Sequence, residues 1–387
     1  MKILLVSTQD YIHHPVPSRH HYIFEELAKR HEVHVPHFHV SDGMNGKERE
    51  TRLQVHEATM FPLKSPLLHY TLNAPCHHHV ISQIVRDEGI DLVVVGHILA
   101  GTAAIRAAEK EGIPVVFDLK DWLPDSAAAY YHNPVLKNTI YKTVWAITRY
   151  NLDHSSEITT VSPSLVDRLK GFGYDSRLIT NGVNTDYFKP LDGLPYRKKL
   201  GIDESTFVIG FSGSIERFFA LDQVLKSFKK VLQFHEDTKL LIVGGSLFTH
   251  YDQEIRSLAD ELGLKDRVIF TGTVPYPEMP HYVACMDVCL IPFSSATWDN
   301  IALPNKFFEY SACGKPILST PVPDVMKIAK ENYQVYRSEE EFLEKVKDLI
   351  REPRNYDLDL SGYSWKVKAG EFEEIFNRLV DGNNRHI

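Results

Sequence analysis

The stretch Leu-Pro-Asn-Lys-Phe-Phe-Glu-Tyr-Ser-Ala-Cys-Gly-Lys-Pro-Ile-Leu-Ser-Thr, residues 303–320, follows an apolar run that ends at Pro292. Proline is tolerated in a first helical turn, and glycine is the usual residue just past a helix end. The pattern predicts a loop, a helix that ends at Gly314, a turn and a strand. Lys306 and Glu309 are three residues apart, so they share one helix face near its N-terminus.

This helix face combines groups that suit a nucleotide. Backbone N–H groups and the helix dipole favour an anion at a helix N-terminus, and the Lys306 ammonium adds positive charge. The Glu309 carboxylate can accept hydrogen bonds from the hydroxyl pair of a ribose. The stretch therefore predicts a site for phosphate and a sugar diol.

Length and composition indicate a globular protein of two domains. A chain of 387 residues is too long for one comfortable core, and 43% hydrophobic with 24% charged residues is ordinary for a folded protein. The net charge of −8 gives no overall attraction to nucleic acid, so we expect no nucleic-acid partner. The four cysteines show no metal or disulfide spacing, and signal-peptide and membrane-spanning patterns are missing. We expect a cytoplasmic protein, with the inner face of the membrane as an alternative.

Many of the twenty histidines crowd into the first eighty residues. Those that stand out are His13, His14, His20, His21, His31, His34, His37, His39 and residues 77–79. None belongs to an HExxH pattern, and we expect these clusters on polar loops and helix faces. The sequence therefore predicts no metal site.

Apolar runs alternate with helical patterns along the chain, which predicts an α/β fold with doubly wound parallel sheets. Between Tyr187 and Lys199 the periodicity is lost, and prolines and a glycine accumulate. We therefore place a first domain at residues 1–188 and a second at 189–365. The final helix, residues 366–387, is expected to pack back on the first domain.

Ligands of doubly wound sheets bind at the carboxyl ends of the strands. The segment Phe117–Asp125 lies at such an end, which makes Asp118, Lys120 and Asp121 candidates for chemistry; a polar loop with one helix cap is the alternative. Residues 133–150 predict a helix with an apolar stripe and interleaved basic residues. It either packs on its own domain or contacts a membrane surface.

Glycines also follow two predicted strands of the second domain. Gly213 comes after one, and Gly244 with Gly245 after the next, where a backbone can approach a ligand closely. Arg217 is a candidate clamp for a diphosphate, with a surface salt bridge as the alternative. A GxGxxG pattern is missing after the first strand, which argues against a dinucleotide oxidoreductase.

The segment from Leu303 to Pro316 resembles the donor-site signature of GT-B nucleotide-sugar glycosyltransferases, specifically glycosyltransferase family 4. Weaker segments follow the order of that family: residues 118–125, 160–164, 181–188, 243–245 and 267–273. The resemblance implies two tandem Rossmann-like domains whose parallel sheets face a central cleft. It also implies a donor bound mainly by the second domain, an acceptor bound by the first, no metal or other cofactor, and retention of anomeric configuration.

Site residues follow from this resemblance position by position. Glu309 would bind the ribose hydroxyls, Lys306 would lie by the diphosphate or the sugar, and Asp121 would lie near the reacting sugar. The predicted catalytic residues are Asp121, Lys120 and Asp118. The predicted donor-binding residues are Glu309, Lys306, Asn305, Pro304, Arg217, Gly213, Ser214, Gly244, Gly245, Gly272, Thr273 and Val274. The predicted acceptor-binding residues are Arg19 and His20.

The chain departs from the family pattern at three positions. Ile301 stands where many members have an acidic residue that holds the donor sugar; Asp299 or Asn300 could replace it. Ser214 and Phe219 stand where the family often has an arginine and a lysine that grip the diphosphate. These departures leave the donor and the retention of activity open.

We expect a glycosyltransferase of the hexosyltransferase type that uses a nucleoside diphosphate sugar. Its acceptor would be a hydroxyl of a saccharide or lipid-linked saccharide in glycan or polysaccharide biosynthesis, with peripheral membrane contact left open. A sugar-nucleotide epimerase of related fold and a non-catalytic nucleotide-sugar-binding protein are the alternatives.

Overall fold

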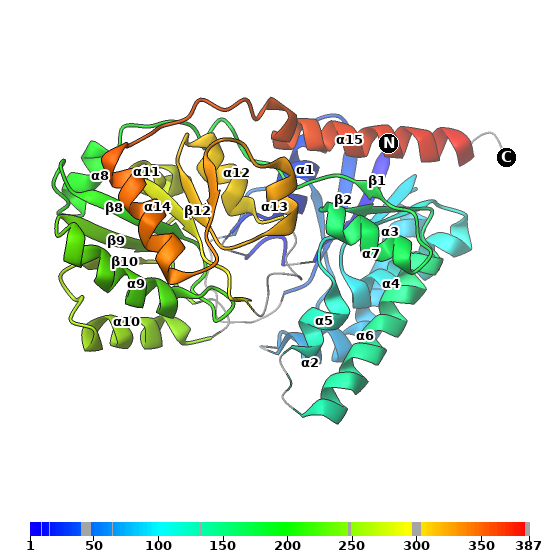
Figure 1. Ribbon diagram of the computed structural model, residues 1–387. Helices are drawn as coiled ribbons and strands as arrows, with labels where there is room; N and C mark the ends of the chain where they lie inside the picture. Colours follow the sequence, from blue (N-terminus) through cyan, green and yellow to red (C-terminus); the bar gives the residue numbers. More distant parts are fainter. Residues whose placement is uncertain are drawn as a thin grey trace. The chain divides into compact units, whose positions relative to one another are not determined.

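A computed structural model describes residues 1–8, 10–14, 16–39, 48–63, 65–129, 131, 133–246, 249–295 and 303–383. The chain divides into two compact units (Figure 1). The first comprises Met1–Asn181 and the C-terminal segment from Trp365, and the second comprises Gly182–Ser364. The change between units therefore lies before Gly182, upstream of the expected position after residue 188. Within the described ranges, no helix has the length and apolarity needed to cross a membrane.

The first unit contains a seven-stranded parallel sheet in the order β3-β2-β1-β4-β5-β6-β7. Its strands are β1 Lys2–Val6, β2 Glu32–His37, β3 Gln54–Glu57, β4 Leu92–Val95, β5 Val115–Leu119, β6 Glu157–Thr160 and β7 Arg177–Leu178. Its helices are α1 Arg19–Leu27, α2 Pro66–Leu72, α3 Ala74–Asp87, α4 Ile98–Glu111, α5 Leu123–Ala128, α6 Pro134–Asp153, α7 Pro163–Gly171 and α15 Trp365–Asn383.

The second unit contains a six-stranded parallel sheet in the order β10-β9-β8-β11-β12-β13. Its strands are β8 Phe207–Ser212, β9 Thr238–Val243, β10 Val268–Gly272, β11 Val288–Ile291, β12 Ile317–Ser319 and β13 Tyr333–Val335. Its α-helices are α8 Leu194–Lys199, α9 Leu221–Phe234, α10 Tyr251–Glu261, α11 Met279–Ala284, α12 Asn305–Ala312, α13 Pro323–Ile328 and α14 Glu339–Arg351. The short 3-10 helices are η1 Tyr276–Glu278 and η3 Ser361–Tyr363.

The first unit draws its core from both ends of the chain. The apolar residues of β1 are fully buried, as expected for a central parallel strand. Phe372 and Phe376 of α15 pack on Phe24 of α1, with ring centroids 6.3 and 6.5 Å from it. Trp365 stacks on Tyr22 of α1 at 5.2 Å. The C-terminal helix thus covers apolar surface of the first unit, and Figure 1 shows α15 beside α1.

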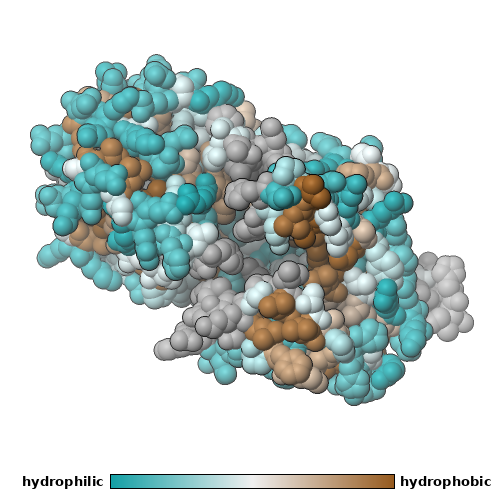
Figure 2. Space-filling view, turned by 90° about the horizontal axis from the view of Figure 1, so that it is seen from below, coloured by the Kyte–Doolittle hydropathy of each residue, from teal (hydrophilic) through white to brown (hydrophobic). Residues whose placement is uncertain are grey.

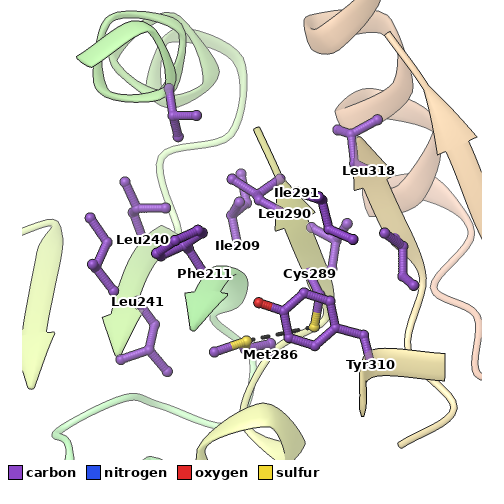
Figure 3. Close-up of a cluster of buried hydrophobic side chains, with 14 of the residues drawn as sticks. Ile209, Phe211, Leu240, Leu241, Met286, Cys289, Leu290, Ile291, Tyr310 and Leu318 are labelled. Atoms are coloured by element: carbon purple, nitrogen blue, oxygen red, sulfur yellow. Dashed lines mark hydrogen bonds between the residues drawn. The ribbon is translucent and has the colours of Figure 1, made fainter. Parts of the chain in front are cut away.

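The second unit has a core in which β8, β9 and β11 meet α12 (Figure 3). Phe211, Leu240 and Tyr310 point into it from three of these elements. Gly210 lies on β8 opposite Met286, whose sulfur would be 2.1 Å from a Cβ at position 210. The methionine side chain therefore occupies the space that a larger residue would need.

The histidines of the first unit are placed differently from the expectation. The residues His20, His21, His34, His37, His69 and His77 are all buried. His34 and His37 lie on β2, the second strand from the edge of the sheet, with Val35 and Pro36 between them. The expected placement on polar loops and helix faces was therefore wrong for His34 and His37, while His20, His21 and His77 lie on helices with their rings buried.

Candidate functional site

Three glycines bring the carboxyl ends of β8, β9 and β10 into direct contact. Gly213, Gly244 and Gly272 have φ angles of 129°, 131° and 70°. The Gly244 amide donates to the Gly272 carbonyl at 3.0 Å. A Cβ on Gly244 would lie 2.0 Å from the carbonyl oxygen of Gly213. Only glycine tolerates these angles and this approach, so backbone groups form the surface here.

Lys306 extends from the first turn of α12 toward the loop after β8. A Cβ on Gly213 would lie 2.3 Å from its Nζ atom, so glycine leaves room for the ammonium. Nζ also lies 4.5 Å from the ring centroid of Phe219 and 5.3 Å from that of Phe211, within cation–π range. Burial lowers the pKa of Lys306 to about 8, and the nearby Glu309 carboxylate opposes this shift.

Glu309 lies one helical turn after Lys306 and faces the segment that follows β10. Its Oε1 atom accepts a hydrogen bond from the Tyr276 hydroxyl at 2.9 Å. Burial raises the pKa of Glu309, while Tyr276 and Lys306 oppose the shift. The side chain remains half-exposed. A positioned carboxylate and a cation thus share one accessible helix face.

The Tyr310 hydroxyl ties α12 to the end of β8. It accepts from the Ser212 amide at 2.9 Å and lies 3.0 Å from the Ser212 hydroxyl. After α12, Gly314 adopts φ 69°, and a Cβ there would lie 2.5 Å from a backbone oxygen. The helix, the glycine turn and the return to β12 agree with the sequence prediction. These contacts fix the direction in which Lys306 and Glu309 point.

The remaining predicted donor-binding residues lie on the same strand ends. A Cβ on Gly245 would lie 3.1 Å from the Thr273 hydroxyl oxygen, so these two loops touch. Thr273 is exposed, and Ser214 and Val274 are half-buried. All four positions border the glycine contacts described above.

The first turn of α12 begins at Asn305, with Pro304 as an extended N-cap residue. Asn305 Oδ1 is buried and has no hydrogen-bond partner in the part of the chain that the structure describes. The positions discussed for the donor sugar, Asp299, Asn300 and Ile301, lie outside the described residues.

Arg217 forms the surface ion pair that was the alternative to a diphosphate clamp. Its Nη2 atom lies 2.6 and 2.7 Å from the two carboxylate oxygens of Glu254. Its guanidinium also lies 4.8 Å from the ring centroid of Tyr251. The surface ion pair is therefore present, on side chains that are 66% and 56% exposed, and the use of Arg217 as a diphosphate clamp stays a prediction.

Asp118 lies at the carboxyl end of β5 and has no exposed surface. Its Oδ1 atom accepts from the Thr159 hydroxyl at 2.8 Å. Its Oδ2 atom accepts from Arg19 Nε at 3.1 Å and lies 3.0 Å from His20 Nε2. Burial alone would raise the pKa of Asp118, but Arg19 and His20 outweigh burial and hold it below its usual range.

This buried network corrects three assignments. Arg19 and His20 are 2% and 0% exposed, and Arg19 also donates to the Thr180 carbonyl at 2.8 Å. Burial lowers the pKa of His20 to about 4, so its ring is neutral at pH 7. Without exposed surface, Asp118 cannot touch a substrate, and neither Arg19 nor His20 can bind an acceptor. These residues hold α1 against β5 and act as positioning residues.

Lys120 and Asp121 follow β5 and keep contact with solvent. Lys120 is half-buried and donates to the Thr8 hydroxyl at 2.6 Å, while Asp121 is exposed. Burial lowers the pKa of Lys120, and the carboxylates of Asp118 and Asp121 oppose this. Surrounding protein raises the pKa of Asp121, and Lys120 opposes this. Of the three residues predicted for catalysis, these two are accessible to a ligand.

The sequence pattern did not single out His97 and Tyr276. His97 lies at the carboxyl end of β4 as the N-cap of α4. Burial lowers its pKa to about 3, with smaller contributions from charges that include Lys120. Its position directly after the run Leu92–Gly96 could have marked it as a strand-end residue. No feature of the sequence marked Tyr276 as a site residue, because its partner Glu309 lies 33 positions further along the chain.

Two family models match most of the chain between them. Residues 20–187 match the model described as Glycosyltransferase Family 4, and residues 206–352 match the model described as Glycosyl transferases group 1. A GDP-mannose-dependent alpha-(1-6)-phosphatidylinositol monomannoside mannosyltransferase of Mycolicibacterium smegmatis is 26% identical over 209 residues, which cover 52% of this chain and 54% of that protein. The chain spans between 33% and 66% of the length of the leading curated relatives that it matches.

Solved structures resemble the chain over nearly its whole length. Sucrose-phosphate synthase from Thermosynechococcus elongatus has a TM-score of 0.78 at 16% identity, with 98% of this chain and 99% of that chain covered. HepE of Anabaena in complex with UDP and glucose has a TM-score of 0.68 at 17% identity, with 100% and 98% covered. At these identities the comparisons show the fold: two Rossmann-like domains of the GT-B class.

Proposed function

Because the chain belongs to the GT-B glycosyltransferases of family 4, we propose that it transfers a sugar from a nucleoside diphosphate donor to a hydroxyl of a saccharide or lipid-linked acceptor. The observation that carries this proposal is the placement of Lys306 and Glu309 on α12. Lys306 lies over Gly213 at the end of β8, and Glu309 is held by Tyr276 after β10. A diphosphate and a ribose diol are the groups that this pair would bind.

The donor side of the reaction belongs to the second unit in this proposal. The bond from the anomeric carbon to the diphosphate breaks, and negative charge grows on the leaving phosphate. The Lys306 ammonium and the backbone amides at the start of α12 would stabilise that charge, so the proposal requires no metal at this site. Gly272, Thr273 and Val274 would border the nucleobase.

We assign the acceptor and the reacting sugar to the accessible groups of the first unit. Lys120 and Asp121 are the charged side chains that reach solvent after β5, and His97 presents a neutral imidazole at the neighbouring strand end. These groups would orient hydroxyl groups by hydrogen bonding. Retention of anomeric configuration is part of the proposal and follows from the family resemblance.

The test is a screen of nucleoside diphosphates and their sugars by thermal shift, followed by a transfer assay with the donor that binds. A ligand at 100 times its Kd stabilises the folded state by about 2.7 kcal/mol, which raises the melting temperature measurably. We expect one nucleoside diphosphate to stabilise the chain and its sugar to be transferred. Binding without transfer across an acceptor panel would favour a non-catalytic binding protein. Conversion of the donor without an acceptor would favour an epimerase.

The same binding measurement has a predicted pH dependence. Lys306 carries its charge below a pKa of about 8 and loses it above, so nucleoside diphosphate affinity should fall as the pH rises from about 7 to about 9.5. Lys306→Met should bind weakly at every pH and lack this decline. A wild-type affinity that is flat through pH 8, or a decline that persists in Lys306→Met, would assign the anion to another group.

A lipid-linked acceptor is supported by exposed apolar side chains of the first unit. They lie on α2, in the segment before it and at the start of α6: Met60, Phe61, Leu68, Leu72, Val135 and Leu136. Figure 2 shows hydrophobic surface gathered on this unit, viewed from the side on which α2 and α6 lie in Figure 1. We propose that this face contacts a membrane from the cytoplasmic side, aided by basic residues of α6.

Vesicle co-sedimentation tests this contact. The double variant Leu72→Asp, Val135→Asp should bind anionic lipid vesicles at least about 10-fold more weakly than wild type. Each substitution removes an apolar side chain that would be buried in the membrane and adds a carboxylate that the anionic headgroups repel. Leu178→Asp, at an exposed apolar residue of β7, is the matched control and should bind as wild type does. Equal binding of the double variant and wild type would contradict the proposal.

A further inference from the structure

A second group of polar side chains lies at the carboxyl ends of β1, β2 and β3. Asp10 and His13 belong to the loop after β1, and His37 and His39 lie at and just beyond the end of β2. One nitrogen from each of the three histidines can be chosen so that all lie within 4.8 Å of one another. The proposed transfer reaction uses none of these four residues.

Three of these residues form a triangle of short contacts. His13 Nδ1 lies 3.1 Å from His37 Nε2 and 3.3 Å from Asp10 Oδ2, and His37 Nε2 lies 3.1 Å from Asp10 Oδ1. Each nitrogen needs a proton to bond to the carboxylate. With both protons present, the two N–H groups face each other at 3.1 Å. No placement of protons satisfies all three contacts.

A metal ion bound by His13 Nδ1, His37 Nε2 and the Asp10 carboxylate would remove this conflict, because nitrogens that bind a metal carry no proton toward each other. Zinc binds histidine nitrogen and carboxylate oxygen at about 2.0 to 2.2 Å, which places neighbouring ligands of a tetrahedron about 3.3 Å apart. The 3.1 Å between the two nitrogens matches that edge, and each nitrogen lies at a similar distance, 3.3 or 3.1 Å, from one of the two Asp10 oxygens. A nitrogen of His39 lies within 4.8 Å of a nitrogen of His13 and of one of His37, which makes His39 the candidate for a fourth ligand.

We propose that Asp10, His13, His37 and His39 bind one divalent metal ion, and that zinc is the ion that this ligand set suits best. Imidazole and carboxylate ligands in tetrahedral arrangement are characteristic of zinc among the common biological metals. The site is separate from the proposed donor site, which lies in the other unit.

A carboxylate lies beside the second ring nitrogen of His37, one of the proposed histidine ligands. His37 Nδ1 lies 2.9 Å from Glu57 Oε2 on β3, so the nitrogen opposite the metal-facing one donates to a carboxylate. Metal-bound histidines in proteins usually donate their second N–H in this way, which fixes the ring and makes it a stronger ligand.

The metal would fasten the loop after β1 to the edge of the sheet. Asp10 Oδ1 already accepts from the backbone amides of Ile12 and His13 at 3.0 and 2.9 Å, which sets the carboxylate in place. Upstream in the same loop, Thr8 accepts from Lys120 at 2.6 Å. The site therefore stabilises a loop that reaches the accessible residues after β5.

Zinc binding by the 387-residue chain, prepared without a histidine tag, stripped of metal with a chelator and then loaded with zinc, tests the proposal. We expect about one zinc ion per chain by elemental analysis after dialysis, and cobalt substitution should give the strong visible absorption of a tetrahedral site. His13→Gln and His37→Gln should each lower zinc affinity at least about 100-fold. Glu57→Gln, which leaves every ligand in place, should lower it about 10- to 100-fold.

Two histidine variants serve as matched controls. His79→Gln removes an exposed histidine of α3 and should leave zinc affinity unchanged. His56→Gln alters the neighbouring group of His34, His56 and Glu88 and should also leave it unchanged. Circular dichroism checks that each variant is folded. Because His13 is only half-buried, His13→Gln should disturb folding less than His37→Gln does. Failure to retain zinc, retention in His13→Gln, or loss in His56→Gln would each overturn the assignment.

Discussion

Glu309→Gln should lower kcat/KM for the nucleotide-sugar donor by about 100-fold or more, because each hydrogen bond from a ribose hydroxyl to a carboxylate contributes about 1.5 to 3 kcal/mol. The amide keeps the size of the side chain and can still accept from Tyr276. The loss should therefore appear as weaker nucleotide binding with unchanged thermal stability. Isothermal titration and initial rates with the donor found by screening measure both quantities.

Two variants calibrate this result. Tyr276→Phe removes only the hydroxyl that holds Glu309 Oε1 at 2.9 Å, so it should reduce affinity less, by about 10-fold or below. Glu344→Gln changes an exposed glutamate of α14 and should have no effect. If Glu309→Gln binds and turns over donor as wild type does, α12 is not the nucleotide site.

Asp118→Asn should destabilise the chain by about 3 to 5 kcal/mol, because it leaves the Arg19 guanidinium buried without its counter-charge. Asp118 is 0% exposed and Arg19 is 2% exposed, so solvent cannot replace the lost contacts. Urea unfolding followed by circular dichroism and tryptophan fluorescence measures the change. Three of the four tryptophans, Trp122, Trp145 and Trp365, lie in the same unit as the network.

A surface ion pair provides the comparison for Asp118. Glu374→Gln removes the partner of Arg177, whose side chain is 41% exposed, and should change stability by less than about 1 kcal/mol. A catalytic role for Asp118 predicts the opposite pattern: Asp118→Asn with wild-type stability and no activity. That outcome would restore Asp118 to the list of catalytic residues.

The sequence predicted the parts of the fold that depend on local pattern. Alternation of buried strands and helices predicted both parallel sheets, because a strand covered on two faces must be apolar throughout. The α12 segment was predicted with Lys306, Glu309 and Gly314 in their observed arrangement, because helix period and glycine conformation are local properties. The edge strand β3 was missed, since Gln54–Glu57 is mostly exposed and carries little apolar signal.

Contacts between distant segments lay beyond the sequence pattern. Arg19 and Asp118 are 99 positions apart, so the sequence could not show that they meet. It therefore presented Arg19, His20 and Asp118 as separate candidate site residues, whereas the structure joins them in one buried network. For Arg217 the sequence favoured a diphosphate clamp slightly over a surface ion pair, and only the structure shows Glu254 beside its guanidinium. The short contacts among Asp10, His13 and His37 join residues whose spacing in the sequence matches no known metal-binding pattern.

By itself the sequence determined the fold class, the family and the helix that carries Lys306 and Glu309, because periodicity, capping residues and a short motif act over a few residues. Only the tertiary structure decided which charged groups are open to a ligand and which are neutralised in the interior. Burial and ion pairing depend on where distant segments meet. The same meeting of segments brought Asp10 and three histidines together as the proposed metal site.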